Sequence, residues 1–584
     1  MSMFKKITAE SSRLGQWSAT AICGNDILSS ALYVSGIAIL FAGVYAPLVF
    51  LLIALVLFFY KSVYTEVVEA LPLNGGAYNC LINTSSKTIA AVAGVTGVLA
   101  YVTTAVISAK TAVEYIHTLL PLPVLVTTLV VLGAFALLVA SGLKGSAKVA
   151  VVIFLFHIEC LVVFLLLGLL FFLQGNSYFL SNITHTYLLI PQQGGILIAL
   201  FFAFSASLLG VSGFESSANF IEEQRLGVFR KTLRNMLIGI AIFNPLITLV
   251  VLNSMDYRHI VHANAFLLSD VARTIGGPIF QYMIVLDAFL VLSGAVLTAY
   301  IAVSGLISRM AADACLPNIL NTKNRSGSFP FIIAVFFLLC SSILLVTKGQ
   351  LLALAGVYTI SFLGEMTFFA IGNLLLKETR KELKRTYRAP VIFVILAFLG
   401  TMVGIVGNVQ IDPANLRNFS LYFIPLFLLV VAIIYQDYLV RFLLRVSEKI
   451  PLPQKKLKKY FEKLTDKRFV AFVHSNENLF RILTYIDRNE TGRHITLVHC
   501  PCDHHTIRGA GTVEIKELIH HLQKTGAFVH LNIDVLFLDM PFGPRAIHEI
   551  VKKLRVKENR ILIGSIHNFH PYDYAELGGV RVIF

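Results

Sequence analysis

Two short polar stretches, GNDILSS at residues 24–30 and GVSGFESS at residues 210–217, each interrupt a long apolar run. The first places Asp26, and the second Glu215, where a membrane-spanning helix is expected. Carboxylates inside a membrane are costly and usually functional. Paired interruptions in matching halves of a chain are typical of inverted-repeat transporters, which bind substrate between their broken helices. The two stretches therefore predict an inverted repeat with a binding site where they meet.

The composition indicates a protein that lies mainly in a membrane. Of its 584 residues, 56% are hydrophobic and only 14% are Asp, Glu, Lys or Arg, whereas about 25% of the residues in a soluble domain are charged. So few charges cannot cover a water-facing surface, which excludes a soluble, disordered, collagen-like or secreted disulfide-rich protein. The seven cysteines lie mostly in apolar runs, where we expect them to act as small packing residues.

Apolar runs of about 20 residues can span a bilayer, and we expect twelve such spans. With the N-terminus in the cytoplasm, the inner loops hold nineteen Lys or Arg residues before the tail, and the outer loops hold four. This asymmetry is an orientation signal, so the net charge of +15 does not indicate a nucleic-acid partner. We expect a multi-pass protein of the plasma membrane (the inner membrane in a bacterium) with both termini cytoplasmic. The expected spans are 17–41, 45–70, 90–116, 122–140, 147–173, 194–220, 234–254, 278–308, 329–347, 350–376, 389–409 and 418–440.

After residue 440 the composition changes to that of a water-soluble domain. Residues 442–584 hold 22 Lys or Arg and 15 Asp or Glu, and no run in them is long enough to span. A basic linker, residues 442–467, is expected to lie against anionic lipid. Over 468–584, β-like runs alternate with helix-like stretches, which predicts a cytoplasmic α/β domain with a largely parallel sheet. The expected strands are 469–473, 494–499, 529–537 and 561–564, and the expected helices lie near 476–487, 514–525 and 544–555.

Four ordered motifs in residues 1–440 resemble those of the amino acid–polyamine–organocation (APC) permeases. The resemblance implies an α-helical membrane protein whose ten-helix core is an inverted 5+5 repeat, with two further helices, so that residues 1–441 form the transporter domain. It also implies import of a small solute by alternating access. The motifs are YTE at 64–66 with LPLNGGAY at 71–78, SGLKGSAK at 141–148, FAF at 202–204 with GFE at 213–215, and SRMAADACLP at 308–317.

The first polar stretch departs from the amino-acid permeases of this superfamily. Those typically carry Gly-x-Gly, whose free amides hold the substrate carboxylate, whereas Asp26 would repel a carboxylate. The sequence DILSSALY at 26–33 instead resembles helix 1 of bacterial proton-coupled potassium importers. Hydroxyl, carbonyl and carboxylate oxygens suit a dehydrated hard cation. Potassium is therefore the leading expectation, and an amino acid or amine, held through its ammonium group, is the alternative. The resemblance implies a substrate site of Asp26, Ser29, Ser30, Tyr33, Thr104, Ser108, Ser212, Gly213, Glu215 and Tyr358.

Proton coupling is expected to involve His157, together with Asp26 and Glu215. His157 falls where similar proton-driven amino-acid permeases carry a buried lysine in helix 5, and an imidazole there would titrate near neutral pH. A histidine that is simply satisfied in a packed helix is the alternative. Alternatively, Asp26 and Glu215 could serve only to stabilise helix ends, because helix N-termini favour anions. One departure from the potassium importers is that their acidic residue in helix 3 is Ala100 here.

The tail resembles the universal-stress-protein domains found behind some transporters, including those potassium importers. The resemblance implies a homodimer through the tail, or a nucleotide second messenger as its ligand. Gly564-Ser565 lacks the preceding glycines of ATP-binding members, so we expect no cofactor. Cys500 and Cys502 lie beside three histidines, but their Cys-x-Cys spacing is not the usual zinc pattern, so we expect no metal.

Other function classes find little support in the sequence. The chain has no Gly-x-Ser-x-Gly, no Walker loop and no His-Glu-x-x-His, which are motifs of hydrolases, ATP-driven proteins and metalloproteases. We therefore do not expect an enzyme. A receptor built on a transport fold, with a signalling tail, is the nearest alternative class, because it would bind the solute without accumulating it.

Overall fold

The computed structural model describes most of the chain, and the structural statements below concern the described residues. The basic linker falls largely outside them, as do Cys502, His504, His505 and Ser565. The described residues are 13–142, 147–225, 227–262, 266–381, 383, 385–446, 467–473, 476–490, 492, 494–500, 510–524, 528–564, 577 and 580–583.

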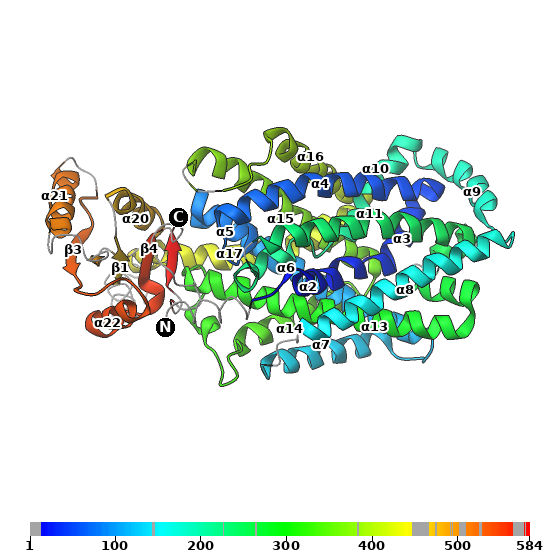
Figure 1. Cartoon of the computed structure of the whole chain (residues 1–584), viewed down its shortest axis with the longest axis horizontal. Helices are drawn as coiled ribbons and strands as arrows, with labels where there is room; N and C mark the ends of the chain where they lie inside the picture. Colours follow the sequence, from blue (N-terminus) through cyan, green and yellow to red (C-terminus); the bar gives the residue numbers. More distant parts are fainter. Residues whose placement is uncertain are drawn as a thin grey trace.

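Residues up to 446 form a bundle of long helices that run roughly along the long axis of the molecule (Figure 1). Helices suit apolar runs in lipid because every backbone N–H and C=O is satisfied within the segment. The helices are α2 (Gln16–Ser29), α3 (Ala31–Ala42), α4 (Ala46–Ala70), α5 (Gly76–Thr84), α6 (Lys87–His117), α7 (Val124–Ala140), α8 (Ala147–Leu173), α9 (Phe179–Gln192), α10 (Ile196–Ser207), α11 (Val228–Ser254), α12 (Tyr257–His262), α13 (Leu267–Ala312), α14 (Pro330–Val346), α15 (Leu351–Thr379), α16 (Val391–Ile411), α17 (Pro413–Ile434) and α18 (Gln436–Val446).

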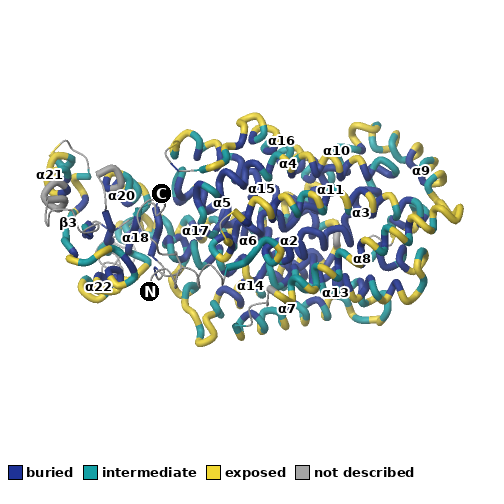
Figure 2. The backbone as a smooth tube through the Cα atoms, viewed as in Figure 1, coloured by how far each residue is buried: buried dark blue, intermediate teal, exposed yellow. Residues whose placement is uncertain are grey.

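Within the described residues, nine helical segments are long and apolar enough to cross a membrane. The first of them, Gln16–Ala70, contains α2, α3 and α4, while α7 and α14 are apolar but shorter. The interior of the bundle is buried, and yellow exposed stretches mark its outer faces (Figure 2). Large apolar side chains lie on those faces; Leu137 is 75% exposed and Leu197 is 80% exposed. Such a surface fits contact with lipid, so the chain is a multi-pass membrane protein.

The second expected interruption is pronounced in the structure. Helix α10 ends at Ser207, and three short 3-10 turns follow it: η2 (Leu208–Val211), η3 (Ser216–Asn219) and η4 (Ile221–Glu223). The first interruption is much smaller than expected. Residues 24–29 remain helical, and only Ser30 separates α2 from α3.

Hydroxyl groups explain why the first stretch stays helical. The Ser29 hydroxyl donates to the Asp26 carbonyl at 2.7 Å, and the Ser30 hydroxyl donates to the Ile27 carbonyl at 2.6 Å. Serine side chains often bond back to the preceding turn in this way. These polar residues are therefore satisfied without unwinding the whole segment.

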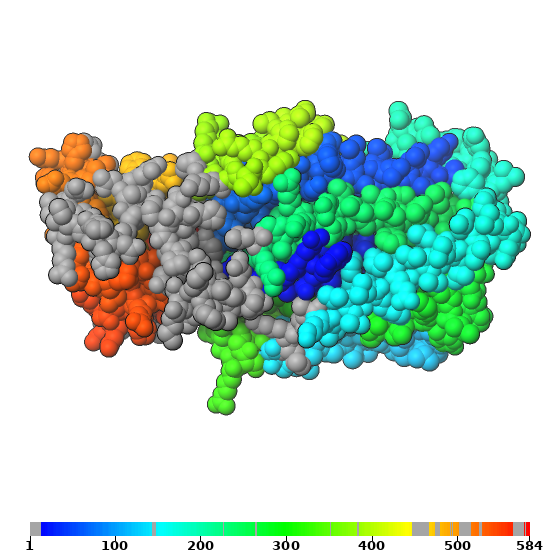
Figure 3. Space-filling model, in the orientation of Figure 1, coloured from blue at the N-terminus to red at the C-terminus, as the bar shows by residue number. Residues whose placement is uncertain are grey.

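The tail contains a five-stranded sheet in the order β3-β2-β1-β4-β5, and all its strand pairs are parallel. The four expected strands are observed, with β3 shorter than expected, and a fifth follows near the C-terminus. In Figure 3 the orange and red tail occupies one end of the molecule, and the helical bundle occupies the rest. The elements are β1 (Arg468–Phe472), α20 (Asn476–Asn489), β2 (His494–His499), α21 (Ala510–Lys524), β3 (Asn532–Phe537), α22 (Pro544–Leu554), η6 (Glu558–Arg560), β4 (Ile561–Gly564) and β5 (Arg581–Ile583).

Candidate functional site

Asp26 lies inside the bundle on α2, and its side chain is buried. The Ser216 hydroxyl donates a hydrogen bond to Oδ2 of Asp26 at 2.8 Å. Its other oxygen, Oδ1, has no hydrogen-bond partner among the described residues. A buried charge without full compensation is costly, so this oxygen is free to bind a cation or a proton.

Gly213 makes the close approach of the two polar stretches possible. Its φ of +89° is left-handed, which suits glycine. A Cβ atom at this position would lie 2.8 Å from Cγ of Asp26, well inside contact distance. Three residues earlier, the Gly210 carbonyl accepts a hydrogen bond from the Ser30 hydroxyl at 2.8 Å. The turn after α10 is therefore packed directly against α2 and the start of α3.

Two tyrosines from different helices converge on Ser212. Tyr33 lies on α3 and Tyr358 on α15, and both are buried with their side chains near the Ser212 hydroxyl. The Tyr358 hydroxyl has no partner in the hydrogen bonds of the described residues. These groups add neutral oxygens beside the Asp26 carboxylate.

Glu215 and Glu365 bring two further carboxylates into the same region. Both are buried, and each lies within the electrostatic field of the other. The field of Asp26 also reaches Glu215. One oxygen of each glutamate, Oε2, has no hydrogen-bond partner among the described side chains and backbone. Next to them the Asn219 amide donates to the Tyr101 hydroxyl, which leaves Oδ1 of Asn219 unpartnered in the described part of the chain.

The cluster contains three carboxyl groups and, among the described residues, no cationic side chain paired with them. In the described part of the chain, no Lys, Arg or His forms an ion pair with Asp26, Glu215 or Glu365. No three His, Cys, Asp or Glu side chains among the described residues are close enough to hold a metal ion together. The carboxylates are therefore spread along a region and do not form one tight metal cage.

Thr104 and Ser108 lie on α6 and are buried. The Thr104 hydroxyl donates to the Ala100 carbonyl of its own helix at 2.9 Å. Helical spacing places both residues on the same face as Tyr101. The hydrogen bonds of the described residues do not join either hydroxyl to Asp26 or Glu215.

His157 lies on α8 and forms a fully buried pair with Asp287 on α13. The Nδ1 atom of His157 is 2.8 Å from Oδ2 of Asp287, and both side chains are 0% exposed. The remaining polar atoms, Nε2 of the histidine and Oδ1 of the aspartate, have no partner within the described residues. His157 is therefore not merely packed among apolar side chains. It forms a hydrogen bond with Asp287 on a second helix, α13.

Sequence reasoning missed Asp287 and Glu365. A signal was available, because each is a lone carboxylate in a long apolar run, and such residues are rarely placed in a membrane without a function. It also missed the polar role of Asn219 and Tyr101, which one sequence cannot distinguish from ordinary packing residues.

The apolar helices, the broken helix at residues 208–223 and the enclosed polar cluster fit a membrane transporter. The family model of the amino acid permeases matches residues 14–433. The chain belongs to this family, and it is a secondary transporter and not an enzyme.

Two solved structures resemble the chain at low sequence identity. They are a glutamate-to-glutamine mutant and a histidine-to-alanine mutant of the manganese transporter of Eremococcus coleocola. Identity is 10% and 11%, and the TM-scores are 0.47 and 0.45. Each match covers 72% of this chain and 93% of the other. The comparison with curated protein sequences gives no match.

Proposed function

We propose that this chain is a proton-coupled importer of a small cation, with potassium as the leading substrate. The observation that carries the proposal is the set of three buried carboxylates, Asp26, Glu215 and Glu365, for which the described residues provide no cationic partner. Desolvated anions of this kind are stabilised by a bound cation or by protons. Transport by alternating access would let such a cation load on one side and leave on the other.

The substrate site of this proposal centres on Asp26. Its free Oδ1 supplies a carboxylate ligand, and the hydroxyls near Ser212 supply neutral oxygens. Oxygen ligands of mixed charge replace the hydration shell of a hard cation. Glu215 and Glu365 lie further along the same polar region, where they would attract a cation or carry a proton. Ser29, Ser30, Thr104 and Ser108 complete the proposed lining through their hydroxyl or carbonyl oxygens.

The His157–Asp287 pair is the proposed proton site. Protonated His157 and ionised Asp287 would form a charged contact between α8 and α13, and loss of the proton would remove that attraction. Helix α8 also contacts α2, since the Asn25 amide donates to the Ala150 carbonyl at 3.0 Å. A change at the pair can therefore reach the segment that carries Asp26.

The architecture that we propose has twelve spans, an inverted repeat and both termini in the cytoplasm, with the transporter domain over 1–441 and the tail domain over 468–584. The segment Gln16–Ala70 is long enough for two spans, one made of α2 with α3 and one of α4. With the two shorter apolar helices α7 and α14, this supports a count of twelve. The excess of Lys and Arg in the inner loops supports the orientation. The parallel sheet supports a universal-stress-like tail, for which a nucleotide ligand or dimerisation remains a proposal.

An amino acid or amine is the second candidate substrate. Membership in the amino acid permease family favours it, and the same carboxylates could hold an ammonium group. The negative balance of the site argues against recognition of a substrate carboxylate by this cluster.

Flux in proteoliposomes tests the proposal. With an acidic exterior, the purified chain should accumulate rubidium as a potassium tracer, and a panel of radiolabelled amino acids and amines should not accumulate. Asp26→Asn should abolish uptake. Asp412→Asn is the matched control, because Asp412 is an exposed N-cap of α17 and asparagine caps helices equally well.

Three results would contradict the cation proposal. Accumulation of an amino acid in place of rubidium would favour the second candidate. Binding of a solute without accumulation would indicate a receptor. Normal uptake by the Asp26→Asn variant would exclude the site.

A further inference from the structure

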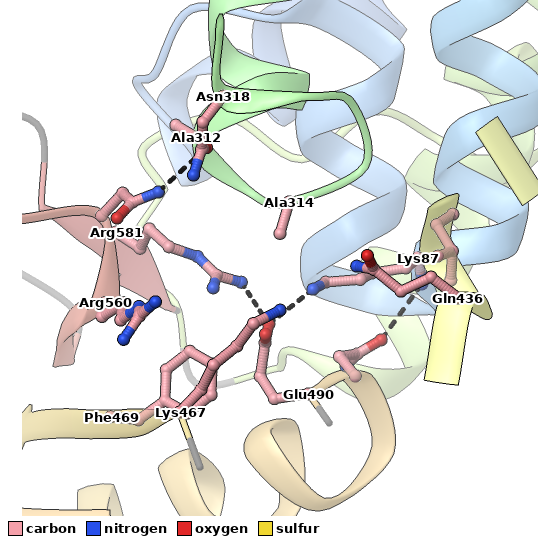
Figure 4. Close-up of a pocket in the computed structure, with 13 residues that line it drawn as sticks. Lys87, Ala312, Ala314, Asn318, Gln436, Lys467, Phe469, Glu490, Arg560 and Arg581 are labelled. Atoms are coloured by element: carbon pink, nitrogen blue, oxygen red, sulfur yellow. Dashed lines mark hydrogen bonds and ion pairs between the residues drawn. The ribbon is translucent and has the colours of Figure 1, made fainter. Parts of the chain in front are cut away.

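The tail and the transporter domain enclose a pocket lined by cationic side chains (Figure 4). Lys87 comes from the start of α6, whereas Arg581, Lys467 and Arg560 come from the tail. The centres of water-sized spheres can occupy about 60 Å3 of the pocket. One water molecule needs roughly 10–15 Å3 of such volume, so the pocket can hold a small polyatomic group such as a phosphate.

Two of the four cations are already neutralised. Glu490 lies between Lys87 and Arg581 (Figure 4), at 2.5 Å from Nζ of the lysine and 2.6 Å from a terminal guanidinium nitrogen of the arginine. Arg581 also contacts Asp313 of the transporter domain at 3.2 Å. All four side chains are at most 5% exposed in these contacts. This network joins the tail to the ends of α6 and α13.

The other two cations, Lys467 and Arg560, have no hydrogen bond or ion pair from their side chains in the described part of the chain. Both are partly buried. Burial lowers the pKa of Lys467, and the nearby charge of Arg560 lowers it further. Burial also lowers the pKa of Arg560. Glu490 and Asp437 also lie in the field of Lys467 and offset part of this lowering. The pocket therefore holds two positive charges that repel each other and that form no ion pair within the described residues.

Asparagine side chains from both the tail and the transporter domain also line the pocket. Asn318, Asn489 and Asn559 all line it. The Asn559 amide donates to Oδ1 of Asn318 at 3.3 Å, across the boundary between tail and transporter domain. Arginine and lysine bind phosphate oxygens through charge-assisted hydrogen bonds.

We propose that this pocket binds a phosphate-bearing anion, held by Lys467 and Arg560 between the tail and the transporter domain. The anion neutralises the two unpaired cations, and because its ligands and neighbours belong to both parts, binding fixes the tail against the ends of α6 and α13. The phosphate group belongs to a soluble ion, to a nucleotide or to an anionic lipid headgroup, and the experiment separates these sources.

The test measures thermal unfolding and equilibrium binding of the purified full chain in neutral detergent. Inorganic phosphate, ATP, and vesicles of phosphatidylglycerol are added in separate arms, with phosphatidylcholine vesicles as the neutral reference. We expect at least one phosphate-bearing arm to raise the melting temperature. A response only to phosphatidylglycerol would assign the phosphate to lipid, whereas a response to phosphate or ATP would assign it to a soluble ligand.

The decisive variant is Lys467→Gln with Arg560→Gln. Its apparent Kd for the active probe should rise about tenfold or more, because two charge-assisted hydrogen bonds are lost. Without any anion its melting temperature should equal or exceed that of the wild type, since a repulsion is removed. Lys552→Gln with Lys553→Gln is the matched control, because these two lysines of α22 are exposed; it should respond like the wild type.

Lys467→Gln alone provides the same test if the double variant does not fold. The proposal is overturned if no phosphate-bearing probe raises the melting temperature, or if the response survives in both variants. These readouts do not depend on transport, so they can fail while the proposed function holds.

Discussion

Replacing Asp287 with asparagine should separate substrate movement from the proton gradient. Asp287 and His157 are both 0% exposed, and their facing atoms are 2.8 Å apart. Asparagine keeps the size of the side chain and can still accept a hydrogen bond from a neutral imidazole. It removes the negative charge that stabilises the protonated histidine.

The structure sets the size of this effect. Breaking a buried ion pair costs about 3–5 kcal/mol, and about 1.4 kcal/mol corresponds to a factor of ten in occupancy. Even at the lower limit, the arrangement of α8 and α13 that this contact stabilises loses roughly a hundredfold in population. Substitution of His157 alone should harm folding more, because it leaves the Asp287 carboxylate buried without a partner.

Proteoliposome flux measures the outcome. The Asp287→Asn variant should still exchange rubidium at equilibrium but should not accumulate it against its gradient when the exterior is acidic. The double variant His157→Gln with Asp287→Asn should behave in the same way and should fold, since no charge is left unpaired. Glu159→Gln is the matched control, because Glu159 lies on the same helix with its side chain exposed.

Full proton-driven accumulation by Asp287→Asn would refute the proposed proton site. Cys160, on the same helix as His157, and Tyr115 on α6 both lie in the field of Asp287. Coupling that survives in Asp287→Asn but disappears in Tyr115→Phe would move the proton site to that tyrosine.

Three further predictions rest on particular buried side chains and turns. Glu66 is fully buried and accepts hydrogen bonds from two side chains and one backbone amide. Glu66→Gln should therefore lower the free energy of unfolding by about 3 kcal/mol or more. Glu378 is exposed, so Glu378→Gln should leave the melting temperature unchanged. Gly213→Ala should reduce rubidium uptake at least tenfold, because the added Cβ would press on Asp26. Gly227 is the control, since it has a similar φ of +77° but open space around it, so Gly227→Ala should lower stability by only about 1–2 kcal/mol through backbone strain. Equal uptake by the two variants would contradict the contact. Burial raises the pKa of Glu490, but Arg581 and Lys87 outweigh this effect and hold the pKa below the ordinary 4.5. The stabilisation by the ionised Glu490 is therefore complete above about pH 4.5 and is lost as the pH falls through the lower pKa of the folded state. Hydrogen exchange in β5 should rise on acidification, and Glu490→Gln should remove that pH dependence.

The sequence predicted the helical membrane fold because the apolar runs are long and the polar interruptions are short. It also predicted the break near residue 213, since Gly-x-x-Gly with several serines cannot continue a helix well. The break in the first stretch was overestimated, because the hydroxyls of Ser29 and Ser30 satisfy the backbone locally. Local bonding of this kind depends on side-chain rotamers, which the order of residues does not specify.

The candidate site was only partly accessible to sequence reasoning. The structure brings Asp26, Ser212, Gly213 and Glu215 together, as the two polar stretches suggested, but it adds Glu365 from a distant helix. The ion pairs between tail and transporter domain could not have been foreseen, because Asp313 and Arg581 are 268 residues apart. Pairing at that separation depends on how two parts of the chain dock, and no local pattern encodes it.

Helices α6 and α13 connect the central site to the contact with the tail. Helix α13 carries Asp287 in its middle and ends beside Asp313, 26 residues or about 39 Å further along at 1.5 Å per residue. Its side chains pack on α6 where glycines leave room, since a Cβ at Gly94 would lie 2.8 Å from Met310. The two helices are therefore closely packed, and the tail contacts an end of each through Lys87–Glu490 and Asp313–Arg581. A shift of α13 relative to the tail would strain these contacts, so an anion that strengthens them would favour the arrangement in which they are formed.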